Sequence, residues 1–167
     1  MKKKSLNIHY HCFESFNDLD ASDRELVEVA THAMSRAYAP YSEFQVGAAL
    51  RMDDNSIVEG NNQENVAYPS GLCAERVALF YAGAQFPEKA VKTIVVIAHS
   101  LPPHLFEDVV SPCGACRQVM LETQSRQKDK IKIILASVKG EGIVFDKVED
   151  LLPFSFDLVD LLTNTGN

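Results

Sequence analysis

The sequence has no long apolar run, and nothing in it approaches the roughly 18 consecutive apolar residues that a membrane-spanning helix needs. It also lacks a basic block: 23 aspartates and glutamates outnumber 16 lysines and arginines, and the formal net charge is −7. A nucleic-acid partner requires a basic patch that displaces counterions from phosphates, whereas the short lysine run at residues 2–4 is typical of a solvated tail. We therefore expect neither a membrane nor a nucleic acid as a partner.

Signals for export are also absent, because residues 6–11 are too polar for the apolar core of a signal peptide. We expect a cytoplasmic protein. The four cysteines could form two disulfides in a secreted chain, but a reducing compartment disfavours disulfides. The tight spacing of Cys113 and Cys116 favours a metal or redox site instead.

What the chain does contain is enough apolar sequence for one core. It has 167 residues, of which 46% are hydrophobic, and it shows no repeat or low-complexity segment. Ser22 and Glu25 form a capping-box pattern that predicts a helix from there to about Tyr38, with Pro40 as the stop. Apolar spacing and turn residues predict further helices over residues 74–84, 114–127 and 157–162, and strands over residues 44–51, 57–60, 93–98, 130–136 and 143–145. Alternation over residues 6–12 predicts an added N-terminal strand.

Three cysteines carry the strongest chemical signal. Cys73, Cys113 and Cys116 have the spacing of metal ligands, and zinc is the natural ion for such a thiolate set. Three ligands leave one tetrahedral position open to water, as in catalytic zinc sites, and zinc makes that water acidic enough to act near neutral pH. Glu75 is then free to carry protons. We expect Cys73 to lie at a helix start and two helix N-termini to point at the metal.

Other interpretations of the cysteines fit less well. A structural zinc site needs four protein ligands, and Cys12 is the single spare cysteine. A Cys-x-x-Cys redox protein would leave Cys73 and Glu75 unexplained. His9 and His11 could be interpreted as a metal pair, but we favour two exposed strand residues because no third ligand lies nearby.

The sequence resembles the small, homotetrameric cytidine deaminases from about Ser22 to Leu162. The resemblance is carried by four blocks in the family's order, at residues 38–50, 60–65, 73–76 and 112–118. It implies an α/β fold, a three-layer α-β-α arrangement around a central mixed five-stranded sheet, to which the N-terminal strand could add. It implies one zinc ion per subunit. Residues 1–20 would be an N-terminal extension and residues 21–167 a single deaminase domain.

The family's activity is the hydrolysis of cytidine and deoxycytidine to uridine and deoxyuridine plus ammonia in pyrimidine salvage. By resemblance, Phe44 lines the pyrimidine pocket and Ala74 is a further substrate-binding residue. Asn62 and Glu64 bind the 3′-hydroxyl of the sugar by resemblance. Such a role suits them chemically, because a carboxylate accepts hydrogen bonds and an amide both donates and accepts.

The resemblance also assigns supporting and intersubunit roles. Arg76 donates hydrogen bonds to the thiolates, while Arg117 and Gln118 either brace the ligands or lie exposed on their helix. Phe156 reaches the pocket of a neighbouring subunit and stacks on the base, so that the active sites of the tetramer are shared.

Two related enzymes remain as alternatives. A polynucleotide deaminase shares the zinc core, but the acidic composition and the sugar-binding loop weigh against it. A blasticidin-type deaminase lacks the Glu that Glu64 supplies here, so Glu64 favours a cytidine deaminase.

Overall fold

A computed structural model describes residues 1–101 and 107–156 of the chain. The helix expected over residues 157–162 lies outside the described residues. In the described ranges, no helix is both long enough and apolar enough to cross a membrane.

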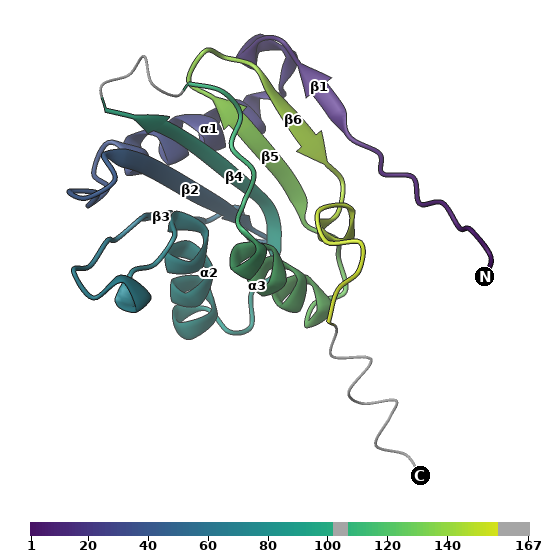
Figure 1. Cartoon of the computed structure of the whole chain (residues 1–167). Helices are drawn as coiled ribbons and strands as arrows, with labels where there is room; N and C mark the ends of the chain where they lie inside the picture. The colour runs from purple at the N-terminus through teal and green to yellow at the C-terminus, as the bar shows by residue number, and fades with distance from the viewer. Residues whose placement is uncertain (102–106, 157–167) are drawn as a thin grey trace.

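A six-stranded mixed sheet forms the centre of the molecule, in the order β1-β6-β5-β4-β2-β3 (Figure 1). Only β4 and β5 are parallel neighbours, and every other pair is antiparallel. The strands are β1 (His11–Phe13), β2 (Phe44–Met52), β3 (Ile57–Asn61), β4 (Val91–Ser100), β5 (Lys132–Ser137) and β6 (Gly142–Phe145). The five expected strands are therefore confirmed, and the N-terminal strand makes the sheet six-stranded.

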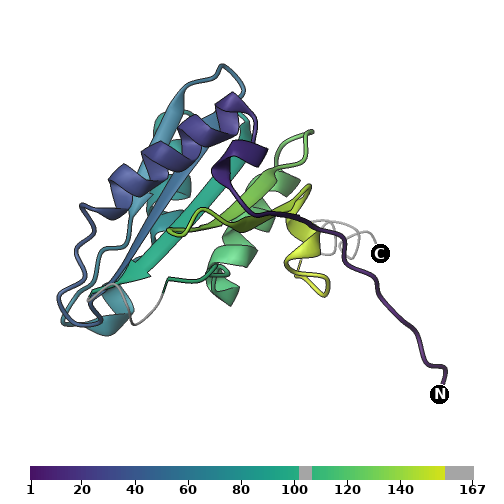
Figure 2. The same ribbon diagram turned by 90° about the horizontal axis from the view of Figure 1, so that it is seen from above.

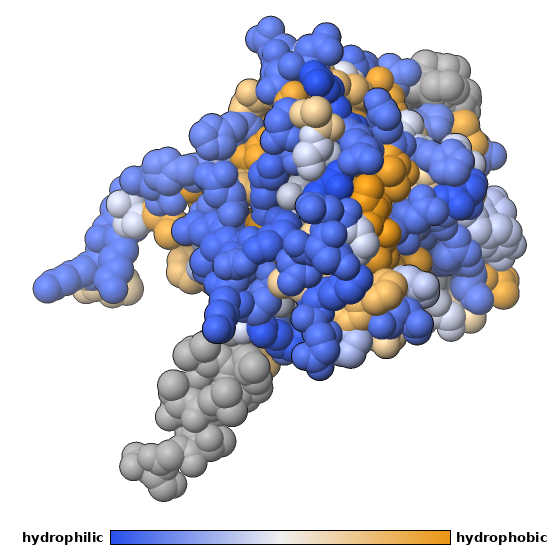
Figure 3. Space-filling view, turned by 180° about the vertical axis from the view of Figure 1, so that it is seen from behind, coloured by the Kyte–Doolittle hydropathy of each residue, from blue (hydrophilic) through white to orange (hydrophobic). Residues whose placement is uncertain are grey.

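Helices cover both faces of the sheet, which gives the three layers expected. On one face lies α1 (Ala21–Met34), and on the other lie α2 (Ala74–Gln85) and α3 (Gly114–Ser125) (Figures 1 and 2). Each face buries its own apolar cluster, and the nearly continuous apolar run of β4 contributes to both, with Ile94 and Val96 on one side and Val95 and Ile97 on the other. A strand buried on both faces has such a run because alternate side chains point to opposite cores. Figure 3 shows the face over α1, which hydrophilic residues cover around a narrow apolar band.

The first helix begins and ends differently from the prediction. Its N-cap is Asp20, whose side chain accepts a hydrogen bond from the Asp23 amide at 2.8 Å, and Ser22 already lies inside the helix. The expected cap at Ser22 is thus wrong, since either residue type can cap a helix and the sequence pattern does not rank them. The helix stops at Met34 rather than near Tyr38, because the Tyr38 backbone bonds to residues 62 and 64 instead.

The N-terminal strand is shorter than its sequence pattern. Only His11–Phe13 pair with β6, while residues 6–10 have no assigned secondary structure. Phe13 is buried and lies over Gly142, where a Cβ atom would come within 2.3 Å of the Phe13 ring. Because glycine leaves that space open, the ring anchors β1 to the body of the fold.

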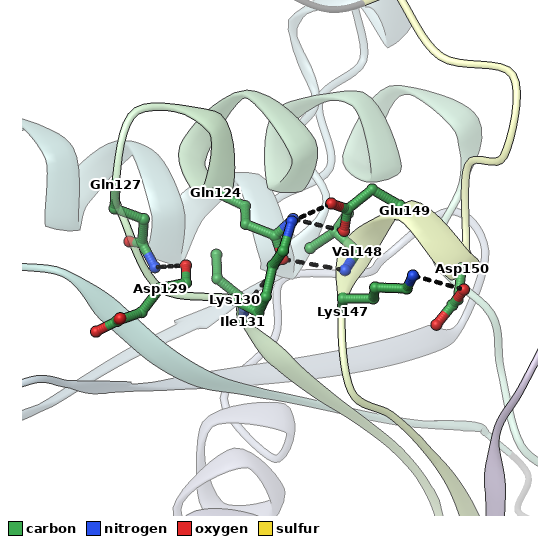
Figure 4. A network of polar contacts seen from close by, with 9 residues as sticks. All are labelled: Gln124, Gln127, Asp129, Lys130, Ile131, Lys147, Val148, Glu149 and Asp150. Carbon is green, nitrogen blue, oxygen red and sulfur yellow. Dashed lines mark hydrogen bonds and ion pairs between the residues drawn. The ribbon is translucent and has the colours of Figure 1, made fainter.

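A buried glutamine fixes the far end of α3 (Figure 4). Gln124 Oε1 accepts hydrogen bonds from the backbone amides of Ile131 and Val148, at 2.9 and 3.2 Å, and its Nε2 donates to Glu149 at 2.6 Å. Lys130 completes the network with an ion pair to Glu149. Since a buried amide that lost these partners would be costly, the network fixes α3 against the start of β5.

Two helices begin at the same edge of the sheet for a topological reason. Strand β3 is antiparallel to β2, and β2 is antiparallel to β4, so β3 and β4 run in the same direction and end at the same edge. The helices that follow them, α2 and α3, therefore both start there. Gly60 near the end of β3 allows α2 to pack closely, since a Cβ atom there would lie 2.7 Å from both Ala74 O and Ala78 N.

We expect the substitution Gly60→Ala to destabilise the protein by about 1–3 kcal/mol, because backbone atoms of α2 cannot move away as a flexible side chain would. Gly83 lies exposed in the same helix, where an added methyl group would meet nothing within 4 Å, and it provides a matched control. Gly83→Ala should instead stabilise by about 0.5–1 kcal/mol through helix propensity. Urea unfolding measures both, and equal effects would contradict the close approach of α2 and β3.

Candidate active site

The three cysteines meet where α2 and α3 begin. Cys73 is the N-cap of α2 and Cys113 is the N-cap of α3, which confirms the expected placement at two helix N-termini. Cys116 lies in the first turn of α3 and is fully buried. Chain direction, rather than sequence proximity, brings Cys73 beside the other two.

The sulfur geometry fits a tetrahedral zinc ion. Cys73 Sγ and Cys113 Sγ are 4.0 Å apart, Cys113 Sγ and Cys116 Sγ are 3.5 Å apart, and all three sulfurs lie within 4.8 Å of one another. Zinc–sulfur bonds of about 2.3 Å at tetrahedral angles place ligand sulfurs about 3.8 Å apart. These three residues can therefore hold zinc with little movement.

The surroundings of the sulfurs favour negative charge on Cys73 and disfavour it on Cys116. The pKa of the Cys73 thiol is lowered to about 5 by a hydrogen bond with Cys116 and, further, by the Arg76 guanidinium, against the effect of burial. The pKa of Cys116 is raised, because its hydrogen bond to Cys73 and its burial both favour the protonated thiol. The trio thus forms one thiolate readily, and a bound cation would displace the remaining protons. The positive ends of two helix dipoles act in the same direction.

Arg76 is placed as expected beside the thiolates. Its Nη2 lies 3.7 Å from Cys73 Sγ, and the pKa of the guanidinium is raised, first by this hydrogen bond. Its Nε is buried without a hydrogen-bond partner in the described part of the chain. A fixed positive charge at this position offsets the negative charge of three thiolates.

Glu75 lies between the metal ligands and a cavity. It is the second residue of α2, only 4% exposed, and it lines the cavity together with Cys73. Its pKa is raised, mainly by burial and further by the charge of Cys73. A carboxyl group with a raised pKa holds a proton more readily than an exposed carboxyl group does, and holding and releasing a proton is the chemistry required of a proton carrier.

The cavity has a volume of about 740 Å³, and it joins the metal site to the predicted substrate residues. Phe44 in β2 and both Asn62 and Glu64 in the loop after β3 line it, so the cavity gathers residues from outside the helix that carries Glu75. Ala74 is fully buried and does not line it, so its contact with substrate stays a prediction. Other lining residues are Tyr41, Ser42, Val46, Gln63, Asn65, Tyr68, Gly71, Leu72, Arg76, Val96, Val110, Ser111 and Cys113.

Glu64 is held ionised at the cavity wall. Burial alone would raise its pKa, but the Ser42 hydroxyl and the amides of Tyr41 and Ser42 donate to its carboxylate, and the net effect lowers the pKa. The left-handed conformation of Glu43, with φ of 53°, turns the chain from this loop into β2. The support from Tyr41 and Ser42 was missed at the level of sequence, although both lie in the block of residues 38–50 that resembles the family.

The Asn62 side chain forms hydrogen bonds with the backbone at the start of β2. Its Oδ1 accepts a hydrogen bond from the Val46 amide at 2.8 Å, and its Nδ2 donates to the Phe44 carbonyl at 2.9 Å. The amide group retains a second lone pair and a second hydrogen for a ligand. These two bonds also fix Phe44 and Asn62 relative to each other.

The predicted bracing residues hold the chain around the site rather than the sulfurs. Arg117 donates to the carbonyls of Pro112 and Leu151, at 2.8 and 2.9 Å, and so fixes the loop that enters α3. Gln118 donates to the Phe156 carbonyl at 2.8 Å. Phe156 itself is 64% exposed and does not line the cavity, so its contact with a neighbouring subunit stays a prediction.

Comparisons with known proteins agree with this geometry. Residues 20–129 match the family model of the cytidine and deoxycytidylate deaminase zinc-binding region. A cytidine deaminase from Halalkalibacterium halodurans is 42% identical over 140 residues, which cover 83% of this chain and 98% of that protein. A cytidine deaminase structure from Burkholderia pseudomallei matches with a TM-score of 0.68 at 39% identity, covering 79% of this chain and 97% of its own. A blasticidin-S deaminase from Bacillus cereus is 29% identical, covering 86% and 97% of the two chains.

The geometry predicts which cysteines hold metal. Cys113→Ala removes a central sulfur, so we expect the purified variant to lose most of its zinc. Cys12 is exposed and lies outside the trio, so Cys12→Ala should retain one zinc ion per chain. Atomic absorption on both variants measures the metal directly, and zinc loss from the Cys12→Ala variant would mean that a fourth cysteine takes part.

Proposed function

The chain belongs to the cytidine and deoxycytidylate deaminase family, and from this premise we propose that it hydrolyses cytidine and deoxycytidine to uridine and deoxyuridine, with release of ammonia, in pyrimidine salvage. The observation that carries the proposal is the placement of Glu75, a buried carboxyl group beside three convergent cysteines in the wall of a cavity of about 740 Å³. The matching relatives support the same reaction.

The division of chemical roles follows from the residues. When bound by the three cysteines, zinc supplies a Lewis acid that makes water a nucleophile at neutral pH. Glu75 accepts a proton from the attacking water and delivers it to ring N3 of the base. The water oxygen meanwhile bonds to C4 of the base. Glu75 then takes the remaining proton from that oxygen and transfers it to the exocyclic amine, so that the bond between C4 and this nitrogen breaks, ammonia leaves and a carbonyl group remains at C4. Arg76 keeps the thiolates charged and oriented during these transfers.

Substrate recognition falls to other residues that line the cavity. Phe44 packs against the pyrimidine ring, while Asn62 and Glu64 bind the 3′-hydroxyl of the sugar. Support comes from the hydrogen bonds that fix Glu64 as a carboxylate: they use three of its roughly four acceptor sites and leave one for a donor such as a hydroxyl. A nucleoside antibiotic of the blasticidin type is the competing substrate, because the Bacillus cereus enzyme aligns over most of the chain.

The proposal includes a homotetramer with shared active sites, in which Phe156 of one subunit reaches the pocket of another. Exposed apolar side chains support an extensive subunit interface; they include Val66, Tyr68, Phe80, Tyr81, Phe154 and Phe156. A mass in solution of four 18.5 kDa chains would establish the assembly.

An ultraviolet assay with cytidine, deoxycytidine, cytosine and blasticidin S tests the reaction. We expect turnover of the first two, and loss of activity with a zinc chelator. Glu75→Gln preserves the side-chain volume but cannot shuttle protons, so turnover should fall by about 10²- to 10⁴-fold while zinc content stays at one ion per chain. Normal deamination by this variant would show that another group carries the proton.

A second substitution tests sugar recognition. Glu64→Gln should reduce kcat/KM for cytidine by about 10- to 100-fold, because a hydrogen bond to a charged group is lost, and it should affect 3′-deoxycytidine little. Glu59 lies on β3 away from the cavity, in an exposed ion pair with Arg36, and Glu59→Gln is the matched control. Equal losses on the two nucleosides would place Glu64 outside the sugar site.

A further inference from the structure

The segment of residues 6–12 has the pattern of a strand but mostly lacks a strand partner. Leu6, Ile8, Tyr10 and Cys12 share one face by alternation, and the first three are 56%, 44% and 55% exposed. The segment continues β1 outward from the body (Figure 1), and residues 6–10 form no ladder with any strand among the described residues. Apolar side chains at every second position, held in water, indicate a surface that another strand covers.

This edge of the sheet is also unprotected. Natural edge strands are blunted by charged residues, proline or bulges, which prevent pairing with another chain. Residues 6–12 contain no aspartate, glutamate, lysine or arginine, no proline and no glycine. His11 Nε2 lies 3.6 Å from Asp146 Oδ2, and this contact is an ion pair only when His11 is protonated. The opposite edge, β3, is different: Glu59 and Arg36 form an ion pair there, and Asn61 donates to the Ala33 carbonyl.

The anchoring of the segment gives it a defined direction. Phe13 is fixed over Gly142 on the α1 side, and the Tyr10 ring packs against Phe145 on the other side, with centroids 5.7 Å apart. Contacts on both faces hold the C-terminal end of the segment in line with the sheet. A strand that pairs with this segment would therefore add to an existing sheet, which is more stable than an isolated pair of strands.

The sequence of the segment complements itself. In an antiparallel pair with the same residues of a second copy, centred on His9, Leu6 lies opposite Cys12 and Ile8 opposite Tyr10. Lys4 then lies opposite Glu14, and neither of these two exposed side chains forms an ion pair with another described residue. Moving the centre of the pair by one residue toward the C-terminus places Leu6 against Glu14 and loses the charge match. Moving it by one residue toward the N-terminus places Lys2 against Glu14 but leaves Lys4 against Cys12, so only the pair centred on His9 matches Lys4 with a charge and Leu6 with Cys12.

We propose that residues 6–12 pair antiparallel with the same residues of a second copy of this chain, and that this pairing joins two six-stranded sheets edge to edge. A second copy is the occupant favoured by the self-complementary pattern, because apolar residues meet apolar residues and opposite charges meet at both ends. A two-fold pair is also a closed assembly, because the same contact covers the β1 edge of both copies at once.

Disulfide trapping tests the pairing in the full-length protein. Leu6→Cys places a thiol opposite the native Cys12 of the second copy, so mild oxidation should give a covalent dimer on a non-reducing gel. Asn7→Cys is the matched control, one residue away on the opposite face. We expect Leu6→Cys to cross-link at least about tenfold faster, because pairing raises the effective concentration of one thiol near the other. Cytidine turnover by each variant checks that the fold is intact.

Further variants separate the pairing from chance collisions and from the zinc cysteines. Leu6→Cys combined with Cys12→Ser should not cross-link. Lys4→Glu in the Leu6→Cys background should slow cross-linking, and adding Glu14→Lys should restore it. Equal rates for the Leu6→Cys and Asn7→Cys variants, or a dimer that forms without Cys12, would overturn the proposal. A membrane-binding tail would give a different pair of results: the wild type, but not the Ile8→Asp variant, would bind anionic vesicles, and the Leu6→Cys variant would not cross-link quickly. That outcome would equally overturn the proposal.

Discussion

The convergence of two helix N-termini on three sulfurs is the constraint on which the rest of the structure depends. Three thiolates around one divalent ion carry net negative charge, and so much charge is stable in a partly buried place only where positive potential meets it. The helix ends of α2 and α3 supply part of that potential, and Arg76 supplies the rest. The strand directions make the convergence possible, because β3 and β4 end at one edge. A chain with the same cysteines but a reversed β2 would place Cys73 at the opposite edge.

Close backbone packing keeps these helix ends in position. Gly60 brings α2 against β3, and Gly47 similarly allows α1 to approach β2, where a Cβ atom would lie 2.0 Å from Ala30 O. The buried Gln124 fixes the other end of α3 by hydrogen bonds to the backbone amides of Ile131 and Val148. The active site therefore has rigid support at some distance, which suits a proton carrier such as Glu75, because proton transfer depends on placement to within a fraction of an ångström.

Much of this arrangement could be predicted from the sequence, and the exceptions have physical reasons. Cys73 at a helix start followed from its spacing to Glu75, and the strands followed from apolar runs and turns. The helix cap was assigned to Ser22 instead of Asp20, because two residues of similar capping strength stand close together and only the fold selects one. The contacts of Ser42 with Glu64 join residues 22 positions apart, and no local pattern encodes such a pairing. Likewise, alternation over residues 6–12 indicated a strand but not how much of it the sheet would pair.

The site and the N-terminal segment lie at separate parts of one sheet, and this separation allows each to change independently. The cavity is lined by β2, β4, the loop after β3 and the starts of α2 and α3, whereas β1 is divided from β4 by β6 and β5. Residues before position 20 lie outside the match to the family model of the zinc-binding region. Because β1 extends the sheet at the edge remote from β3, pairing there adds an intermolecular contact without moving a sulfur or Glu75. A strand added at the β3 edge would disturb the site, because α2 packs directly on β3 and has Cys73 as its N-cap.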